Sequence, residues 1–83
     1  MKSYKIYALG NCPYCEKLIQ FLIDRKITFY VEFLDGNKKK LKEMKIKYEQ
    51  PTVPIVIQVT TSERFIGGCD NTLKLIREGE IDE

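Results

Sequence analysis

Residues 4–23, YKIYALGNCPYCEKLIQFLI, change their hydrophobic period halfway along, and this change sets how the fold begins. Residues 4–9 (YKIYAL) are rich in aromatic and branched side chains and end at a Gly-Asn turn, which is typical of a β-strand. From Pro13 onward the apolar side chains recur at the spacing of one helix face, at Cys15, Leu18, Ile19, Leu22 and Ile23. The stretch therefore predicts a strand that leads into an amphipathic helix.

Two cysteines stand at the start of this predicted helix. Pro13 suits the first helical position, because its missing N–H has no partner there, and Asn11 or Cys12 is then the N-cap. Unpaired N–H groups and the helix dipole stabilise an anion at that end. Such sites lower a thiol pKa from about 8.5 to roughly 3.5–7.5. We therefore expect Cys12 to be the attacking thiolate, and Cys15, one turn inside the helix, to resolve the mixed disulfide.

A cysteine pair at this spacing can be a structural staple, half of a metal site or a redox pair. Helical neighbours three apart have Cβ atoms roughly 5 to 6 Å apart. A disulfide needs about 3.5 to 4.5 Å, so a small adjustment closes it. The loop is so short that the bridge restrains the unfolded chain very little. This favours a switch over a staple.

The metal alternative requires more ligands than the chain offers. A closed zinc site takes four, whereas the chain has no histidine and only one further cysteine, Cys69. We therefore expect no metal. An iron–sulfur cluster shared between two subunits, with external thiols, stays open as an alternative.

The remainder of the chain continues the alternation of strands and helices. Residues 28–34 (TFYVEFL) predict a second strand before a turn at residues 35–37, and residues 55–59 (IVIQV) predict a third. A turn at residues 60–63 then leads to a short partner strand, residues 64–66.

Two more helices are predicted between and after these strands. Leu41, Met44 and Tyr48 share one face of a lysine-rich helix. Asp70 and Asn71 are suitable caps for a last helix, which carries Leu73 and Ile76 and can end at Gly79. The order predicts a single α/β domain over residues 1–83, with a parallel βαβ unit followed by an antiparallel hairpin.

Composition limits the classes of function. Of the 83 residues, 43% are hydrophobic and 31% charged, which suits a folded domain. The net charge of +2 is too weak to imply nucleic acid. No apolar run approaches the roughly 18 to 20 residues of a membrane span. The N-terminal stretch is too short and too polar for a secretory signal, so we expect a cytoplasmic protein. We also expect a monomer that does not associate with membranes.

Lysines are concentrated in one ten-residue segment, which suggests the solvated face of the second helix or, as an alternative, a surface that attracts acidic partners or an anionic thiol cofactor. They are Lys38, Lys39, Lys40, Lys42, Lys45 and Lys47.

Three short motifs together resemble one known family. They are Cys12-Pro13-Tyr14-Cys15, Thr52-Val53-Pro54 and Gly67-Gly68-Cys69-Asp70. They resemble the CPYC active site, the TVP loop and the GG-C/Y-D segment of dithiol glutaredoxins, in the same order and spacing. The likeness covers nearly the whole chain. Thioredoxins usually carry CGPC after a tryptophan, and this chain has no tryptophan.

The resemblance implies a fold and an activity. Glutaredoxins have a thioredoxin-like fold, a four-stranded mixed sheet with three helices in the order βαβαββα. Their usual activity is glutathione-dependent reduction of protein disulfides and of glutathione mixed disulfides. The resemblance thus implies glutathione as the reductant and disulfide-containing client proteins, with ribonucleotide reductase as one example. It also implies a cis peptide bond before Pro54.

The same resemblance implies which residues hold glutathione. The backbone of Val53 would pair with its cysteinyl part beside Pro54, and Tyr14 would line the groove. Asp70 and Asn71, at the start of the last helix, would hold the γ-glutamyl carboxylate, in keeping with the anion affinity of a helix N-terminus. The side chain of Asp70 would either meet the ammonium group or cap the helix.

Three positions depart from the family pattern. Leu9 stands where many glutaredoxins have lysine, Gln50 where a polar or basic residue is usual, and Asn71 where aspartate is more common. We expect Gln50 to contribute by hydrogen bonding. The missing lysine motivates an alternative, a redoxin reloaded by thioredoxin reductase. An iron–sulfur module is disfavoured, because family members that hold clusters usually have CGFS-type sites.

Overall fold

Four strands form one mixed sheet in the order β2-β1-β3-β4. The structure is a computed structural model that describes residues 3–77. Strands β1 (Ser3–Ala8) and β2 (Phe29–Phe33) run parallel. Strand β3 (Ile55–Val59) is antiparallel to β1, and β4 (Glu63–Gly67) is antiparallel to β3. The predicted parallel unit and hairpin are both confirmed. The bounds of β3 are those predicted, and the ends of the other three strands differ from the prediction by one residue.

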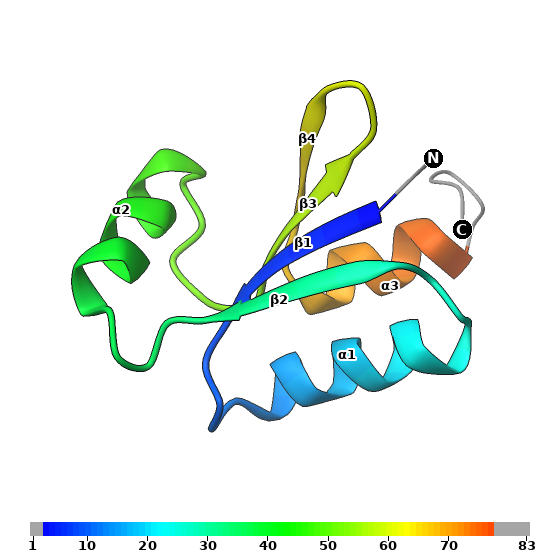
Figure 1. Ribbon diagram of the computed structural model, residues 1–83, viewed down its shortest axis with the longest axis horizontal. Coiled ribbons are helices and arrows are strands. Elements are labelled where there is room, and N and C mark those ends of the chain that lie inside the picture. The colour runs from blue at the N-terminus through cyan, green and yellow to red at the C-terminus, as the bar shows by residue number, and fades with distance from the viewer. Residues whose placement is uncertain (1–2, 78–83) are drawn as a thin grey trace.

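Three helices cover the two faces of this sheet. Helices α1 (Pro13–Asp24) and α3 (Cys69–Arg77) lie together on one face, and α2 (Lys38–Lys47) lies apart from them (Figure 1). The element order βαβαββα is confirmed. The expected stop at Gly79 lies outside the described residues. Between residues 3 and 77, no helix combines the length and the apolar content needed to cross a membrane.

The main core lies between the sheet and helices α1 and α3. Alternate side chains of a strand point to opposite faces, and Tyr4, Ile6 and Ala8 of β1 all enter this core with no exposed surface. Helices α1 and α3 contribute apolar side chains that face these strand residues, among them Leu18, Leu22, Leu73 and Ile76. This packing holds the N-terminus of α1 against the sheet.

Ile23 does not join the core, so the predicted helix face was too wide. Its side chain is 52% exposed, whereas Leu22 is fully buried. At about 100° per residue, Leu22 lies only about 20° around the helix from Cys15, while Ile23 lies about 80° away. The sheet covers the narrower sector, and Ile23 falls outside it.

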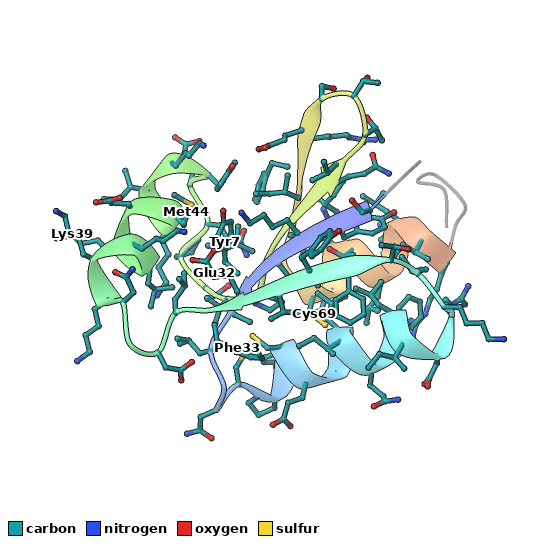
Figure 2. The ribbon with its side chains drawn as sticks, in the orientation of Figure 1. Tyr7, Glu32, Phe33, Lys39, Met44 and Cys69 are labelled. Atoms are coloured by element: carbon teal, nitrogen blue, oxygen red, sulfur yellow. The ribbon has the colours of Figure 1, made fainter. Side chains whose placement is uncertain are left out.

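The second core, under α2, is smaller. It contains Tyr7, Leu34, Ile55 and Ile57, against which Leu41, Met44 and Tyr48 pack while staying partly exposed. No side chain of α2 is fully buried. Figure 2 shows Met44 directed toward Tyr7 and Lys39 directed away from the sheet. The predicted apolar face of this helix is confirmed, and its lysines point mainly to solvent.

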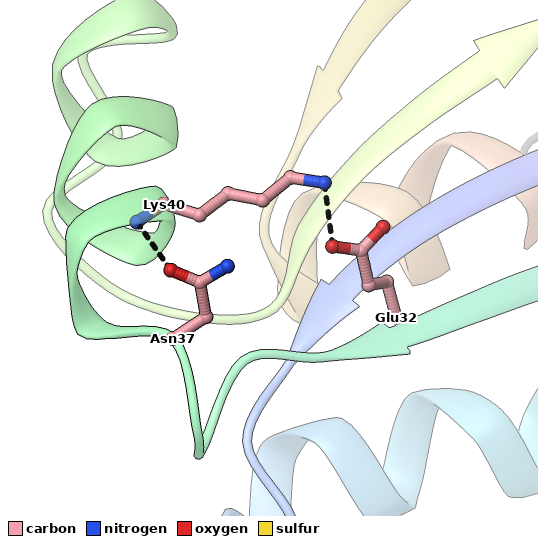
Figure 3. A network of polar contacts seen from close by, with 3 residues as sticks. All are labelled: Glu32, Asn37 and Lys40. Carbon is pink, nitrogen blue, oxygen red and sulfur yellow. Dashed lines mark hydrogen bonds and ion pairs between the residues drawn. The ribbon is translucent and has the colours of Figure 1, made fainter.

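Two polar contacts hold the N-terminus of α2 (Figure 3). The side chain of Asn37 caps the helix by accepting the Lys40 N–H at 3.1 Å. The ammonium of Lys40 lies 2.6 Å from a carboxylate oxygen of Glu32 on β2. The cap acts locally at the start of the helix, and the ion pair joins α2 to β2 at the edge of the sheet.

Candidate active site

Cys12 is the N-cap of α1, and Asn11 is therefore excluded from that position. The backbone of Cys12 is extended (φ −123°, ψ 111°), which turns its side chain back over the first turn of the helix. There Sγ accepts the N–H of Cys15 at 3.3 Å. The same sulfur lies 3.9 Å from the carbonyl oxygen of Val53. Cys12 is half-buried, so incoming molecules can still reach it.

Cys15 lies beneath it and is only 1% exposed. Burial raises the pKa of its thiol to about 12, and the hydrogen bond with Cys12 acts in the same direction. Cys15 therefore keeps its proton at neutral pH. The unequal exposure of the two cysteines, predicted from the helix spacing, is confirmed. All three cysteines are free thiols in this structure.

A loop before β3 forms the opposite wall of the site. Its Val53-Pro54 peptide bond is cis, as the family resemblance implied. The loop starts from the end of α2, where the N–H of Gln50 donates to the carbonyl of Lys45 at 2.9 Å. The Gln50 side-chain amide then donates to the hydroxyl of Thr52 at 3.3 Å. In this way the end of α2 positions the loop next to Cys12.

A groove of about 320 Å³ joins these segments. It is lined by all six residues predicted to bind glutathione, which are Tyr14, Gln50, Val53, Pro54, Asp70 and Asn71. Thr52, Gly68 and Cys69 also line it and were not predicted as site residues. Because these three residues belong to the TVP and GGCD motifs, the sequence could have indicated that they line the groove. Leu9 instead packs against the second core and is absent from the groove lining.

The start of α3 differs from the prediction. The helix begins at Cys69, so Asp70 lies in its first turn and does not precede it. The side-chain amide of Asn71 donates back to the carbonyl of Ile66 on β4, so Asn71 is not a cap. The reason is Gly67: its φ of +127° turns the chain into the helix early, with Asn71 packed against it. The first turn of α3 still borders the groove through Asp70 and Asn71.

Gly68 lets the loop and α3 approach closely. A Cβ atom there would lie 2.9 Å from the side-chain nitrogen of Gln50. Next to it, Cys69 is 4% exposed, and burial raises its pKa. Figure 2 shows Cys69 between the sheet and α1. Within residues 3–77, no group of three or more His, Cys, Asp or Glu side chains could hold a metal ion.

Comparison with known proteins gives a consistent result. The sequence model of the glutaredoxin family matches residues 4–61, more than half of the chain. Glutaredoxin 3 of Escherichia coli strain K12 is 33% identical over 82 residues, covering 99% of this chain and 95% of that protein. A glutaredoxin from Pseudomonas aeruginosa is 34% identical over 82 residues, covering 99% of this chain and 94% of its own length.

Solved structures agree on the fold. A solution structure of a dithiolic glutaredoxin from Trypanosoma brucei brucei has a TM-score of 0.75 at 26% identity, covering 93% of this chain and 79% of that one. The crystal structure of a wheat glutaredoxin has a TM-score of 0.77 at 24% identity, covering 93% and 74%, a likeness that bears on the fold alone.

Proposed function

Since the chain belongs to the glutaredoxin family and is a thiol–disulfide oxidoreductase, we propose that it carries electrons from glutathione to protein disulfides and glutathione mixed disulfides. One observation carries this proposal. An accessible thiol at a helix N-terminus, with a second thiol buried beneath it, stands across from the Val53 carbonyl that borders a groove of about 320 Å³. The thiols supply the chemistry, and the groove has room for a small peptide.

The first step belongs to Cys12. Its thiolate attacks one sulfur of the client disulfide, a mixed disulfide forms, and the other client sulfur leaves as a thiolate. The N–H of Cys15, 3.3 Å from Sγ, remains a donor to the charged form of Cys12. The positive end of the α1 dipole acts in the same direction. Both stabilise the attacking group before the client arrives.

The second step belongs to Cys15. Its sulfur attacks Sγ of Cys12, the Cys12–Cys15 disulfide forms, and the client leaves with the proton that Cys15 gives up. The high pKa of Cys15 owes part of its value to the hydrogen bond with Cys12 and to the charge of Cys12. Both vanish once Cys12 is in a mixed disulfide. Cys15 thus becomes easier to deprotonate when its reaction is due.

Glutathione, a consumed substrate, restores the dithiol. One molecule opens the disulfide and forms a mixed disulfide with Cys12, and a second removes it as oxidised glutathione. Glutathione is anionic, so the first N–H groups of α3 offer an attractive end for one carboxylate. Asp70 and Asn71 stand there, the backbone of Val53 faces the cysteinyl part, and Gln50 and Tyr14 line the remaining walls.

Two serine variants test these roles. Cys12→Ser should abolish turnover of every disulfide in a glutathione-coupled assay. Cys15→Ser should keep turnover of glutathione mixed disulfides and lose most reduction of protein disulfides, since only the latter need a resolving thiol. A normal rate for Cys12→Ser contradicts the proposal, and equal loss of both activities in Cys15→Ser contradicts the assigned roles. Mass spectrometry of Cys15→Ser should detect a glutathione adduct on Cys12.

Leu9 favours an alternative reductant. It stands at the position where many glutaredoxins have a lysine, and its side chain packs against the second core. In that case thioredoxin reductase reloads the Cys12–Cys15 pair. The rate with glutathione and glutathione reductase, compared with the rate with thioredoxin reductase, separates the two. We propose glutathione as the faster donor.

The biological setting follows from the proposed chemistry. We propose that the chain is a single-domain, monomeric protein that works in the cytoplasm, where cysteines are kept reduced. Ribonucleotide reductase is one client that such an electron donor could serve. Purified protein and purified reductase in a reconstituted turnover assay test this assignment.

A further inference from the structure

A second hollow lies between α1 and α3. Its volume is about 290 Å³, and its lining combines three cations, one carboxylate and one apolar side chain, namely Lys17, Lys74, Arg77, Asp70 and Leu73. Leu73 is only 4% exposed and forms an apolar floor under the charges. None of the roles proposed above uses this hollow.

The hollow adjoins the groove beside Cys12, because Asp70 lines both. From Asp70, the lining residues of α3 follow at helical spacing, so they form one stripe along the helix. The stripe from residue 70 to residue 77 is roughly 10 Å long. It leads away from the reactive sulfur, and an extended peptide covers it with about three residues.

The cations of this hollow have no carboxylate partner among residues 3–77, where the single ion pair joins Lys40 to Glu32. The guanidinium of Arg77 is held 5.7 Å from the ring centre of Phe21 on α1. Lys17 and Arg77 also act on the neighbouring groove, since both oppose the rise in the pKa of Cys69. Within the described part of the chain, the lining of the hollow therefore carries more positive than negative charge.

We propose that this hollow binds an acidic segment of the client polypeptide, adjacent to the client cysteine whose disulfide reacts at Cys12. The proposal rests on the proposed function and adds a client class to it. With the glutathione half of a mixed disulfide in the first groove, the client half continues over the hollow. Asp70 repels acidic side chains at the near end, so they lie at the Lys74–Arg77 end, within a few residues of the client cysteine.

The test uses three synthetic peptides, each joined to glutathione through one cysteine. The residues that flank the cysteine are acidic, neutral or basic in otherwise identical sequences. The released peptide thiol is measured by chromatography at low and high salt. The wild-type protein should show a kcat/KM about tenfold higher for the acidic than for the neutral peptide at low salt, and a smaller ratio at high salt.

Charge reversal locates the effect. Lys74→Glu/Arg77→Glu should remove the preference for the acidic peptide. A matched control, Lys39→Glu/Lys42→Glu, makes the same change in net charge on exposed positions of α2 and should keep the preference. Lys74→Gln alone alters an exposed side chain, preserves the contact of Arg77 with Phe21, and should lower the ratio about threefold.

The outcomes separate this inference from the function on which it rests. Turnover of the neutral peptide with no acidic preference overturns the acidic-segment site and leaves the glutathione-dependent activity standing. No turnover of any peptide by the wild-type protein overturns the proposed function as well. Equal loss of preference in the α2 control shows a general charge effect and overturns the site. A wild-type dimer that Lys74→Glu/Arg77→Glu dissociates assigns the hollow to a second copy and also overturns it.

Discussion

Cys15 makes the stability of the reduced protein depend on pH. Burial, the largest cause, raises its pKa from 9.0 to about 12, so the folded protein holds this proton more tightly than the unfolded chain. The contribution to stability is complete below pH 9 and is lost as the pH rises from 9 toward 12. We expect the reduced wild-type protein to lose about 1.4 kcal/mol more than Cys15→Ala between pH 7 and pH 10.

Urea unfolding in the presence of a reductant measures this difference. Lysine and tyrosine side chains also titrate in this window, but both proteins contain them, so their effects cancel in the comparison. Parallel curves of unfolding free energy against pH for the two proteins would show that Cys15 ionises equally easily in the folded and unfolded states.

Among the connecting elements, the loop after β2 holds the loop that carries the redox motif. The carboxylate of Asp35 accepts the N–H of Gly10 through both oxygens, at 2.9 and 3.1 Å. Gly10 lies two residues before Cys12, so this contact restrains the backbone that leads to the N-cap. We expect Asp35→Ala to destabilise the protein by about 1 kcal/mol and to slow the reaction of Cys12 with disulfides several-fold.

Asp24→Ala is the matched control for this contact. Asp24 accepts a hydrogen bond from Gln20 at the far end of α1, on an exposed surface. Loss of this hydrogen bond should leave the rate of the reaction between Cys12 and disulfides unchanged. Stopped-flow measurement of mixed-disulfide formation, with thermal unfolding alongside, gives both quantities. If Asp35→Ala keeps the wild-type rate, the hydrogen bonds between Asp35 and Gly10 do not position Cys12 for its reaction.

Across the whole molecule, burial is divided unequally between the two faces of the sheet. Leu22 is fully buried in the main core, whereas Met44 in the second core is only partly buried. We expect Leu22→Ala to cost about 3 to 5 kcal/mol and Met44→Ala about 1 to 2 kcal/mol in urea unfolding. A protein of this size has roughly 4 to 12 kcal/mol in total, so Leu22→Ala consumes a large share. Equal costs would mean that α2 is as firmly packed as α1.

Much of this architecture is readable from local patterns. The change of period at Pro13 predicts the first strand and helix, and the spacing of Leu41, Met44 and Tyr48 predicts the face on which α2 rests. The groove residues were predicted because the three motifs have the same order and spacing as in glutaredoxins. Ile23 was missed because periodicity indicates a direction around the helix and says nothing of how far the sheet extends. The early start of α3 was missed because a cap residue and a first-turn residue look alike in sequence.

Residue order alone therefore gave the succession of elements, the redox pair and the three motifs, since each depends on neighbours in the chain. Folding was needed to bring the Val53 carbonyl within 3.9 Å of the Cys12 sulfur and to set Lys17 beside Lys74 and Arg77. These features join segments tens of residues apart. Their distances arise from packing between elements, which no local pattern encodes.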